Sequence, residues 1–215
     1  MKKVKNVLFD IDGTLTDSAP GIIQAYTVVA KKMKVSAPSI DSLRDFIGSP
    51  LRGSLATFVP KGKVEEAVKH YYHCYDYMRI GLTQNRVQDG VIDALTKIKF
   101  SGKRLYIVTA KLKDFTLPIL NLFELETFFQ NVYAPEVGEP SDMCDQIRNA
   151  LVCEKLDLSE TVMVGDRRFD FDGANNNHIG FIGVSWGYGP RRELELCGAK
   201  YIVDTPEELA DLLAG

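Results

Sequence analysis

The 215-residue sequence lacks most of the features that mark specialised protein classes. It contains no internal repeat, no low-complexity tract and no apolar run of about eighteen residues that could cross a membrane. Lys and Arg never occur more than two in a row, and the formal net charge is −3. Nucleic acid and anionic membranes are therefore not expected partners, and a small molecule is.

Cysteine is scarce, and a targeting segment is not expected. The four cysteines form no Cys-x-x-Cys pair and show no regular spacing, which favours thiols in a reducing compartment over disulfides or zinc. The charged start Met1-Lys2-Lys3 resembles a secretory signal, but Asp10 interrupts the apolar stretch Val7–Phe9 at once. We expect a cytoplasmic protein, and the sequence leaves open whether it is a monomer or a homodimer.

The chain does contain a clear alternation of strand and helix patterns. It is 45% hydrophobic, enough to bury a sizeable core. Apolar strands separated by helices predict a parallel sheet covered on both faces, which is a doubly wound α/β fold. The expected strands are residues 7–9, 105–108, 161–164, 181–184 and 201–203, and the expected helices include 115–123, 142–156, 172–175 and one capped by Thr205.

One segment interrupts this alternation early. From about Asp17 to Gln84 the sequence shows little strand character, and apolar residues recur at three- and four-residue spacings. We expect residues 1–16 and 85–215 to form the α/β core and residues 17–84 to form a helical cap. An insertion directly after the first strand emerges at the carboxyl edge of the sheet, where it could act as a lid.

Two carboxylates follow the first apolar strand. Asp10 and Asp12 share one face of an extended chain and lie at the edge where open parallel sheets bind ligands. An Asp-Gly pair alone is more often a turn. A calcium loop is excluded by spacing, because it needs Gly at position six and Glu at position twelve, where this chain has Leu15 and Gly21.

Three strings carry a family resemblance. Asp10-Ile11-Asp12-Gly13-Thr14-Leu15 resembles the first motif of the haloacid dehalogenase superfamily, Val108-Thr109-Ala110-Lys111 the second, and Val164-Gly165-Asp166-Arg167-Arg168-Phe169-Asp170 the fourth. The chain looks like a phosphoglycolate-phosphatase-like member with a small helical cap. The resemblance implies a magnesium-dependent phosphatase that acts on a small phosphorylated metabolite.

The resemblance also implies a role for each matched residue. Asp10 would be the nucleophile and a Mg²⁺ ligand, and Asp12 would transfer protons while its backbone carbonyl binds the metal. Thr109 and Ala110 would contact the phosphoryl group. Asp166 would be a direct Mg²⁺ ligand, because hard cations prefer carboxylate oxygens, and Asp170 would orient the ion without binding it.

The third motif departs from the family pattern. Phosphatases of the superfamily place a lysine before the Gly-Asp strand, but this chain has none between positions 113 and 155. Met143 falls at the lysine position, or Glu139 in another register. Loss of one such electrostatic donor typically costs roughly a hundred- to a thousandfold in rate. Lys111 and Arg167 are candidate replacements, and Lys111 is counted among the catalytic residues.

Several functional alternatives stay open. Asp12 favours phosphate-ester chemistry over dehalogenation, a phosphomutase would use the same groups, and Met143 motivates a catalytically weakened ligand-binding or regulatory protein. Arg52, in the Gly48–Arg52 stretch, resembles a substrate-contacting cap residue and equally fits a plain helix connection. Trp186–Gly189 could form a pocket wall or only a glycine-rich turn. The tyrosines at 71, 72, 75 and 77 are expected in the cap core.

Overall fold

The structure, a computed structural model, describes residues 3–139 and 142–215. It divides into two compact units, Met1–Asp17 with Val87–Gly215 and, inserted between them, Ser18–Arg86. The chain leaves the first unit through β2 (Thr16–Asp17) and returns through β3 (Arg86–Val87), and these two short strands pair. Within the described residues no helix is long and apolar enough to span a bilayer.

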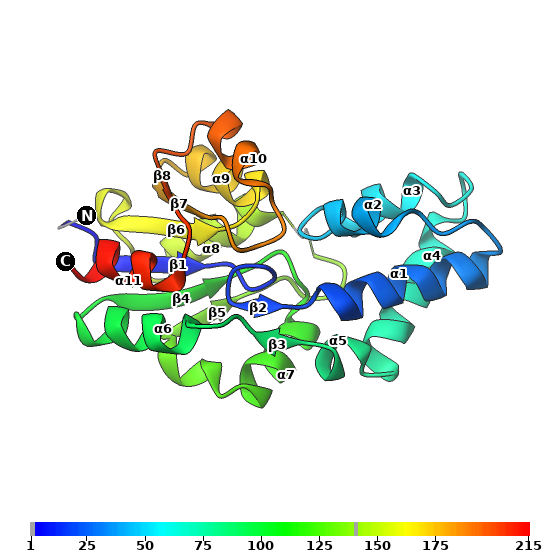
Figure 1. The fold of residues 1–215 in the computed structure, drawn as a ribbon, viewed down its shortest axis with the longest axis horizontal. Coiled ribbons are helices and arrows are strands. Elements are labelled where there is room, and N and C mark those ends of the chain that lie inside the picture. The colour runs from blue at the N-terminus through cyan, green and yellow to red at the C-terminus, as the bar shows by residue number, and fades with distance from the viewer. Residues whose placement is uncertain (1–2, 140–141) are drawn as a thin grey trace. The chain divides into compact units, whose positions relative to one another are not determined.

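The first unit is built on a six-stranded sheet of order β5-β4-β1-β6-β7-β8 (Figure 1). Every pairing in it is parallel. The first strand in the sequence lies in the middle, so the chain order runs outward in both directions from β1. This confirms the predicted doubly wound α/β fold. The strands are β1 Asn6–Phe9, β4 Arg104–Val108, β5 Asn131–Tyr133, β6 Thr161–Gly165, β7 Gly180–Val184 and β8 Tyr201–Val203.

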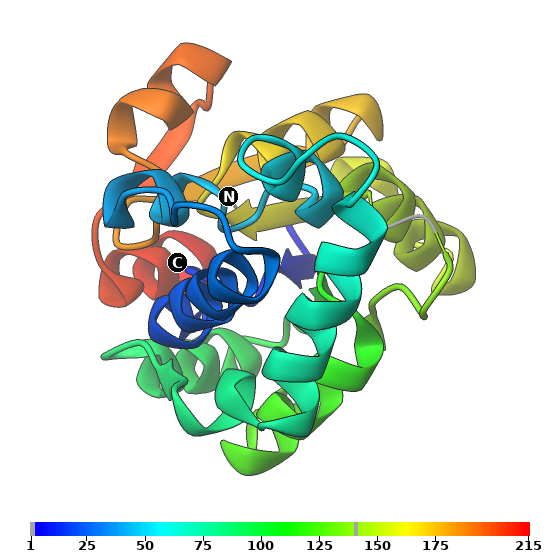
Figure 2. The same cartoon turned by 90° about the vertical axis from the view of Figure 1, so that its right-hand side faces the viewer.

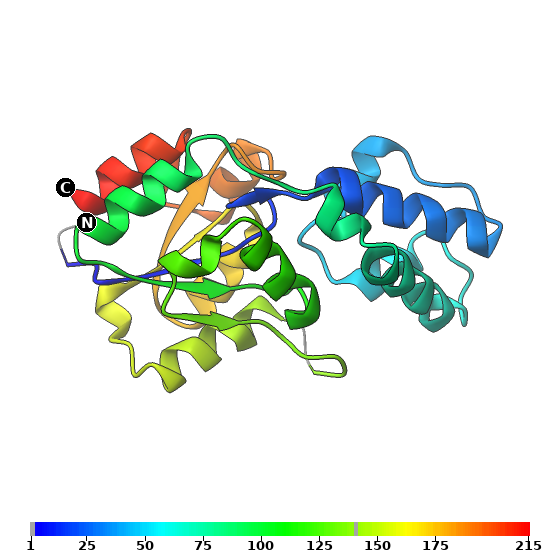
Figure 3. The same ribbon diagram turned by 90° about the horizontal axis from the view of Figure 1, so that it is seen from below.

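Helices cover both faces of this sheet because successive strand residues point to opposite sides. Val7 and Phe9 belong to the core on one face, and Leu8 belongs to the core on the other. On the first face, α6 and α11 pack side by side (Figure 3). The first face is covered by α6 (Val91–Phe100), α7 (Lys113–Leu122) and α11 (Pro206–Ala214), and the second by α8 (Met143–Cys153), α9 (Arg168–Asn176) and α10 (Arg191–Cys197).

Several elements differ from the sequence prediction, and α10 (Arg191–Cys197) was not predicted at all. The edge strand β5 was not predicted, because its three residues Asn131–Tyr133 include only one aliphatic side chain and none is fully buried. Helix α7 begins at Lys113, two residues before the expected start, and contains Pro118, while Thr116 and Ile119 are buried on its inner face. Helix α9 starts at Arg168 rather than near residue 172.

The inserted unit, seen in blue and blue-green in Figure 2, is helical and has an aromatic core. Tyr71 stacks on Tyr75 with ring centroids 5.7 Å apart and meets Tyr26 at 5.1 Å. Tyr71 and Tyr75 are buried, as expected for cap core, and the side chain of Tyr77 lies outside the described residues. The elements are α1 Ala19–Met33, α2 Ile40–Asp45, α3 Leu51–Ala56, α4 Val64–Tyr72, the π-helix η1 His73–Tyr77 and α5 Ile80–Thr83.

Candidate active site

The central strands deliver polar residues to one edge of the sheet. Strand β1 pairs in parallel with β4 on one side and β6 on the other, and the three end at nearly the same level. Asp10 follows β1, Thr109 follows β4 and Asp166 follows β6. All three residues are buried, at the carboxyl edge where open α/β sheets bind ligands.

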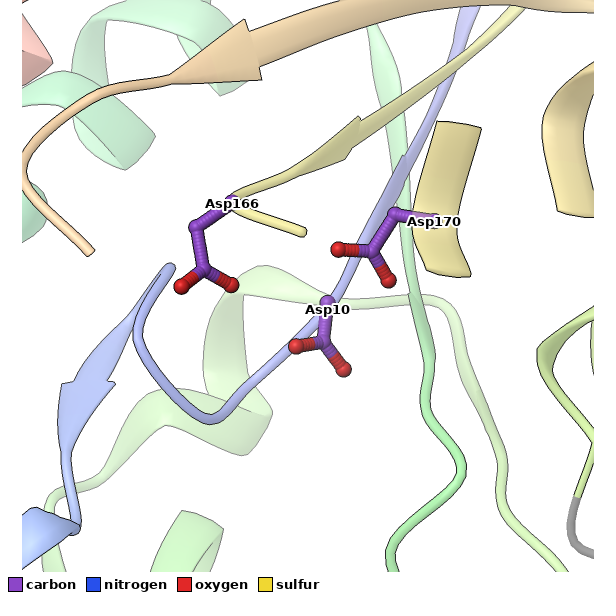
Figure 4. Close-up of side chains that lie close together, drawn as sticks. All are labelled: Asp10, Asp166 and Asp170. Atoms are coloured by element: carbon purple, nitrogen blue, oxygen red, sulfur yellow. The ribbon is translucent and has the colours of Figure 1, made fainter. Parts of the chain in front are cut away.

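Three carboxylates converge at this edge. Oxygens of Asp10, Asp166 and Asp170 all lie within 4.8 Å of one another, and the three side chains face a common space (Figure 4). Asp170 comes from the first turn of α9, where its Oδ2 accepts a hydrogen bond from the Arg167 amide at 3.0 Å. This bond closes the N-terminal turn of the helix, which explains why α9 begins before residue 172.

Burial and mutual repulsion disfavour three charges in so small a space. Burial, followed by the charges of Asp170 and Asp166, raises the pKa of Asp10 well above its usual range. Burial raises the pKa of Asp166 to about 6, and burial together with the Asp166 charge raises the pKa of Asp170 to about 8. The arrangement therefore favours the binding of positive charge.

The donor set fits a hard divalent cation. Asp166 Oδ2 accepts from the amides of Tyr188 at 2.6 Å and Gly189 at 3.4 Å, whereas its buried Oδ1 has no hydrogen-bond partner. A carboxylate oxygen left unpaired beside two further carboxylates is suited to Mg²⁺. In the described part of the chain this is the one cluster of three or more metal-ligating side chains, so the histidines of η1 and α4 form no such site.

Asp12 lies beside these acids and has a cationic partner. Lys111 Nζ donates to both of its carboxylate oxygens, at 3.0 Å and 2.8 Å. The Lys111 amide also donates to Thr109 Oγ1 at 3.3 Å, which is a local hydrogen bond within the second motif. Gly13 permits the turn after Asp12, because its φ of +90° is left-handed and an added Cβ would lie 2.4 Å from Asp166 Oδ2.

Residues 7–184 match the haloacid dehalogenase-like hydrolase family. The chain belongs to this family. It is 34% identical over 192 residues, covering 88% of this chain and 86% of the relative, to a 5'-nucleotidase of Pseudomonas aeruginosa. It is 27% identical to a phosphoglycolate phosphatase of Caulobacter vibrioides, covering 96% of this chain and 91% of that protein. A crystal structure of a predicted phosphatase from Clostridium acetobutylicum superposes with a TM-score of 0.91 at 33% identity, over 98% of both chains.

The haloacid dehalogenase resemblance found in the sequence is thus confirmed. The structure also shows where Met143 and Glu139, the two candidates for the lysine position of the third motif, lie. Met143 is the first residue of α8 and is 6% exposed in the core between α8 and the sheet. Glu139, the other candidate, is exposed, and its carboxylate accepts from the Glu136 amide at 2.9 Å. Pro140, on which that second register depends, lies outside the described residues.

The two candidate replacement cations differ in their partners. Lys111 contacts Asp12 directly. Arg167 Nε donates to Glu193 at 3.0 Å, and its charge lowers the pKa of Asp166 and Asp170 by less than burial raises them. Lys111 is therefore in hydrogen-bond contact with a residue of the first haloacid dehalogenase motif.

Arg52, the proposed substrate contact, belongs to the inserted unit. It lies in α3, exposed, and its guanidinium makes two hydrogen bonds to Glu65, at 2.7 Å and 3.1 Å. The contacts that place it are therefore those of a surface ion pair within its own unit.

Sequence reasoning missed the hydrogen-bond donors to Asp166. They come from the Ser185–Gly189 loop after β7, where Trp186 Nε1 also donates to the Thr14 carbonyl at 3.0 Å. The signal was the Gly-Tyr-Gly string itself, because glycines on both sides of a residue let the backbone approach another group closely. In this member of the family that group is the acid of the fourth motif.

Proposed function

We propose that this protein hydrolyses phosphate monoesters of small metabolites in two steps, through an aspartyl-phosphate on Asp10 and with Mg²⁺ as cofactor. One observation carries the proposal. The buried cluster of Asp10, Asp166 and Asp170 lies at the carboxyl edge of the sheet, beside an Asp12 that is held by Lys111. The phosphatase names of the relatives support the same reaction class.

In the first step, a carboxylate oxygen of Asp10 attacks phosphorus and the bond from phosphorus to the ester oxygen breaks. The departing oxygen takes a proton from Asp12, which acts as general acid. The Thr109 hydroxyl donates to a phosphoryl oxygen, and the backbone at Ala110 lines the same position. Covalent capture on Asp10 divides one difficult displacement into two easier ones.

In the second step, water attacks the phosphorus of the aspartyl-phosphate. Asp12, now ionised, takes a proton from this water as general base. The bond between phosphorus and Asp10 breaks, which releases inorganic phosphate and restores the Asp10 carboxylate. Lys111, bound to Asp12, supplies positive charge beside the reacting group in place of the lysine that the third motif lacks.

The carboxylates of Asp10 and Asp166 and the backbone carbonyl of Asp12 would hold the metal. When bound, Mg²⁺ supplies positive charge that neutralises phosphoryl oxygens and helps align them for in-line attack. Asp170, fixed by the Arg167 amide, would orient this arrangement. The unpaired Asp166 Oδ1 is the observation that supports a metal at this position.

Nucleoside monophosphates and phosphoglycolate are the first substrates to test, because relatives carry the names 5'-nucleotidase and phosphoglycolate phosphatase. We propose that the helical unit acts as a lid that excludes water during the first step, and that Arg52 contacts the substrate. The proposed setting is the cytoplasm, with a small phosphorylated metabolite as partner rather than nucleic acid or a membrane, and with the chain a monomer or a homodimer.

A second candidate, a ligand-binding protein with weak turnover, is favoured by the apolar Met143 at the start of α8. A phosphomutase would use the same catalytic groups. Product analysis separates the three: free phosphate identifies the hydrolase, an isomerised sugar phosphate the mutase, and binding without either product the weakened protein.

The decisive experiment is a phosphate-release screen over a panel of phosphomonoesters, with and without MgCl₂. We expect magnesium-dependent release from at least one small substrate and its loss in Asp10→Asn. The matched control is Asp93→Asn, because Asp93 is an exposed aspartate in the first turn of α6. Phosphate release that survives in Asp10→Asn would show that the nucleophile is another group.

A further inference from the structure

The loop Ser185–Gly189, between β7 and α10, makes hydrogen bonds to the first motif, to Asp166 of the fourth motif and to Asp17 of β2. Trp186 Nε1 donates to the carbonyl of Thr14, which belongs to the first motif. The Tyr188 amide donates to Asp166 Oδ2, and the Tyr188 hydroxyl donates to Asp17 Oδ1 at 3.0 Å. A loop with no expected catalytic residue therefore holds both the first and the fourth motif.

Two glycines of this loop lie too close to Asp166 to carry a side chain. A Cβ on Gly187 would be 2.3 Å from Asp166 Cβ and Oδ2, and a Cβ on Gly189 would be 2.2 Å from the Asp166 carbonyl oxygen. Neither glycine has a left-handed φ, so the requirement is for space and not for backbone conformation. The close approach brings the amides of Tyr188 and Gly189 within reach of one carboxylate oxygen.

The two oxygens of the Asp166 carboxylate differ in their hydrogen bonds. Oδ2 accepts both loop hydrogen bonds, whereas buried Oδ1 has no hydrogen-bond partner. The Asp166 carboxylate offers one oxygen to the cluster with Asp10 and Asp170. Donors on one oxygen restrict rotation of the carboxylate, so the other oxygen keeps a fixed direction. Groups that orient a ligand in this way strongly influence metal affinity.

We infer that Tyr188 is a positioning residue for the metal site: its amide fixes the Asp166 carboxylate, and its hydroxyl, anchored on Asp17, fixes the amide. This inference rests on the proposed metal site but not on the proposed hydrolysis. Asp17 belongs to β2 and ends the Met1–Asp17 segment, which contains the first motif. Tyr188 thereby joins the position of Asp166 to the position of that segment.

Two variants test the two contacts separately: the hydroxyl bond to Asp17 and the close approach of the loop to Asp166. Tyr188→Phe removes the hydroxyl bond to Asp17 and keeps the amide, and we expect the Mg²⁺ dissociation constant to rise about tenfold, the low end for such orienting groups. Gly187→Ala forces a methyl group against Asp166, and we expect a rise of about a hundredfold. The matched controls are Tyr201→Phe, an exposed tyrosine of β8, and Gly180→Ala, where the nearest atom to an added Cβ is 3.4 Å away.

The test is a thermal-unfolding titration of the full chain with MgCl₂ in the absence of substrate. The Mg²⁺ dissociation constant is obtained from the rise of Tm with MgCl₂ concentration. We expect this constant to increase in Tyr188→Phe and Gly187→Ala and to match wild type in both controls. In kinetics, Tyr188→Phe should need more Mg²⁺ for half-maximal activity and should recover most of kcat at saturating Mg²⁺. Substitution of a residue with only a structural role would instead lower the metal-free Tm and leave the Mg²⁺ dissociation constant unchanged.

A Mg²⁺ dissociation constant in Tyr188→Phe equal to that of wild type overturns the inference, even if Gly187→Ala fails to fold. A wild-type protein that shows no magnesium-dependent shift overturns it together with the metal site. If wild type responds to Mg²⁺ as expected but releases phosphate from no substrate, the positioning role stands and the hydrolase proposal fails.

Discussion

Lys111 Nζ lies 3.0 Å and 2.8 Å from the two carboxylate oxygens of Asp12, and the two side chains are only 7% and 13% exposed. A cation with so little access to water interacts with its partner more strongly than a surface lysine does. This pair places positive charge beside the first motif, in a chain that has no lysine between positions 113 and 155.

We predict that Lys111→Met lowers kcat about a hundred- to a thousandfold, because it removes one preorganised cation and leaves Asp12 without its charged partner. Steady-state kinetics at saturating Mg²⁺ provides the measurement. Lys113→Met is the matched control, since Lys113 and Glu136 are 42% and 65% exposed and their ion pair contributes little. Equal losses in the two variants would remove Lys111 from the catalytic set.

Met143→Lys tests the missing charge from the other direction. Because Met143 is buried in the core at the start of α8, we predict that lysine there lowers stability by about 1–3 kcal/mol and does not raise kcat. Urea unfolding and phosphate release measure the two effects. A large gain in turnover would show that the chain lacks a charge that Lys111 does not replace.

The stability of the metal-free protein should fall as pH rises from about 4 to about 8. Burial raises the folded-state pKa of Asp166 to about 6 and of Asp170 to about 8, from a usual value of 3.8. The folded state therefore holds more protons than the unfolded state in this window, and stability is lost as these groups ionise. Thermal unfolding in EDTA across this range measures the slope, which Asp170→Asn should reduce.

Asp166→Asn should separate metal binding from folding. Removing one charge from three crowded carboxylates is predicted to raise the metal-free Tm by about 2–4 °C, equivalent to roughly 1 kcal/mol for a chain of this size. The same change should abolish stabilisation by MgCl₂, because it neutralises the ligand whose Oδ1 lacks a partner. A variant that Mg²⁺ still stabilises like wild type would exclude Asp166 as a ligand.

Within the inserted unit, Gly81 and Gly53 form a contrasting pair. A Cβ on Gly81 would lie 2.1 Å from the Tyr75 ring, so Gly81→Ala should cost about 1–3 kcal/mol by overpacking the aromatic core. Gly53, exposed in α3, has nothing within 4 Å of an added Cβ, so Gly53→Ala should stabilise by up to about 1 kcal/mol. Urea denaturation compares the two variants.

Local sequence patterns correctly predicted the central strands and the capped C-terminal helix. The strands around Leu8, Ile107 and Val164 carry continuous apolar runs, as buried parallel strands require, and the Thr205 cap accepts from the Glu208 amide at 3.2 Å. The edge strand at Val132 was missed because its three residues include one aliphatic side chain and bury little apolar surface. The start of α9 was misplaced because Asp170 was assigned from the sequence to the metal site and was not identified as the residue that caps the helix.

The sequence by itself determined the fold class, the family and the acids Asp10, Asp12, Asp166 and Asp170, because these depend on short apolar runs and on spacings of a few residues. Only the tertiary structure decided which groups meet across long stretches of chain. It placed Lys111 on Asp12, buried Met143 in the core, and brought the Tyr188 amide to one oxygen of Asp166. Such contacts follow from strand register and loop packing, which local patterns do not encode.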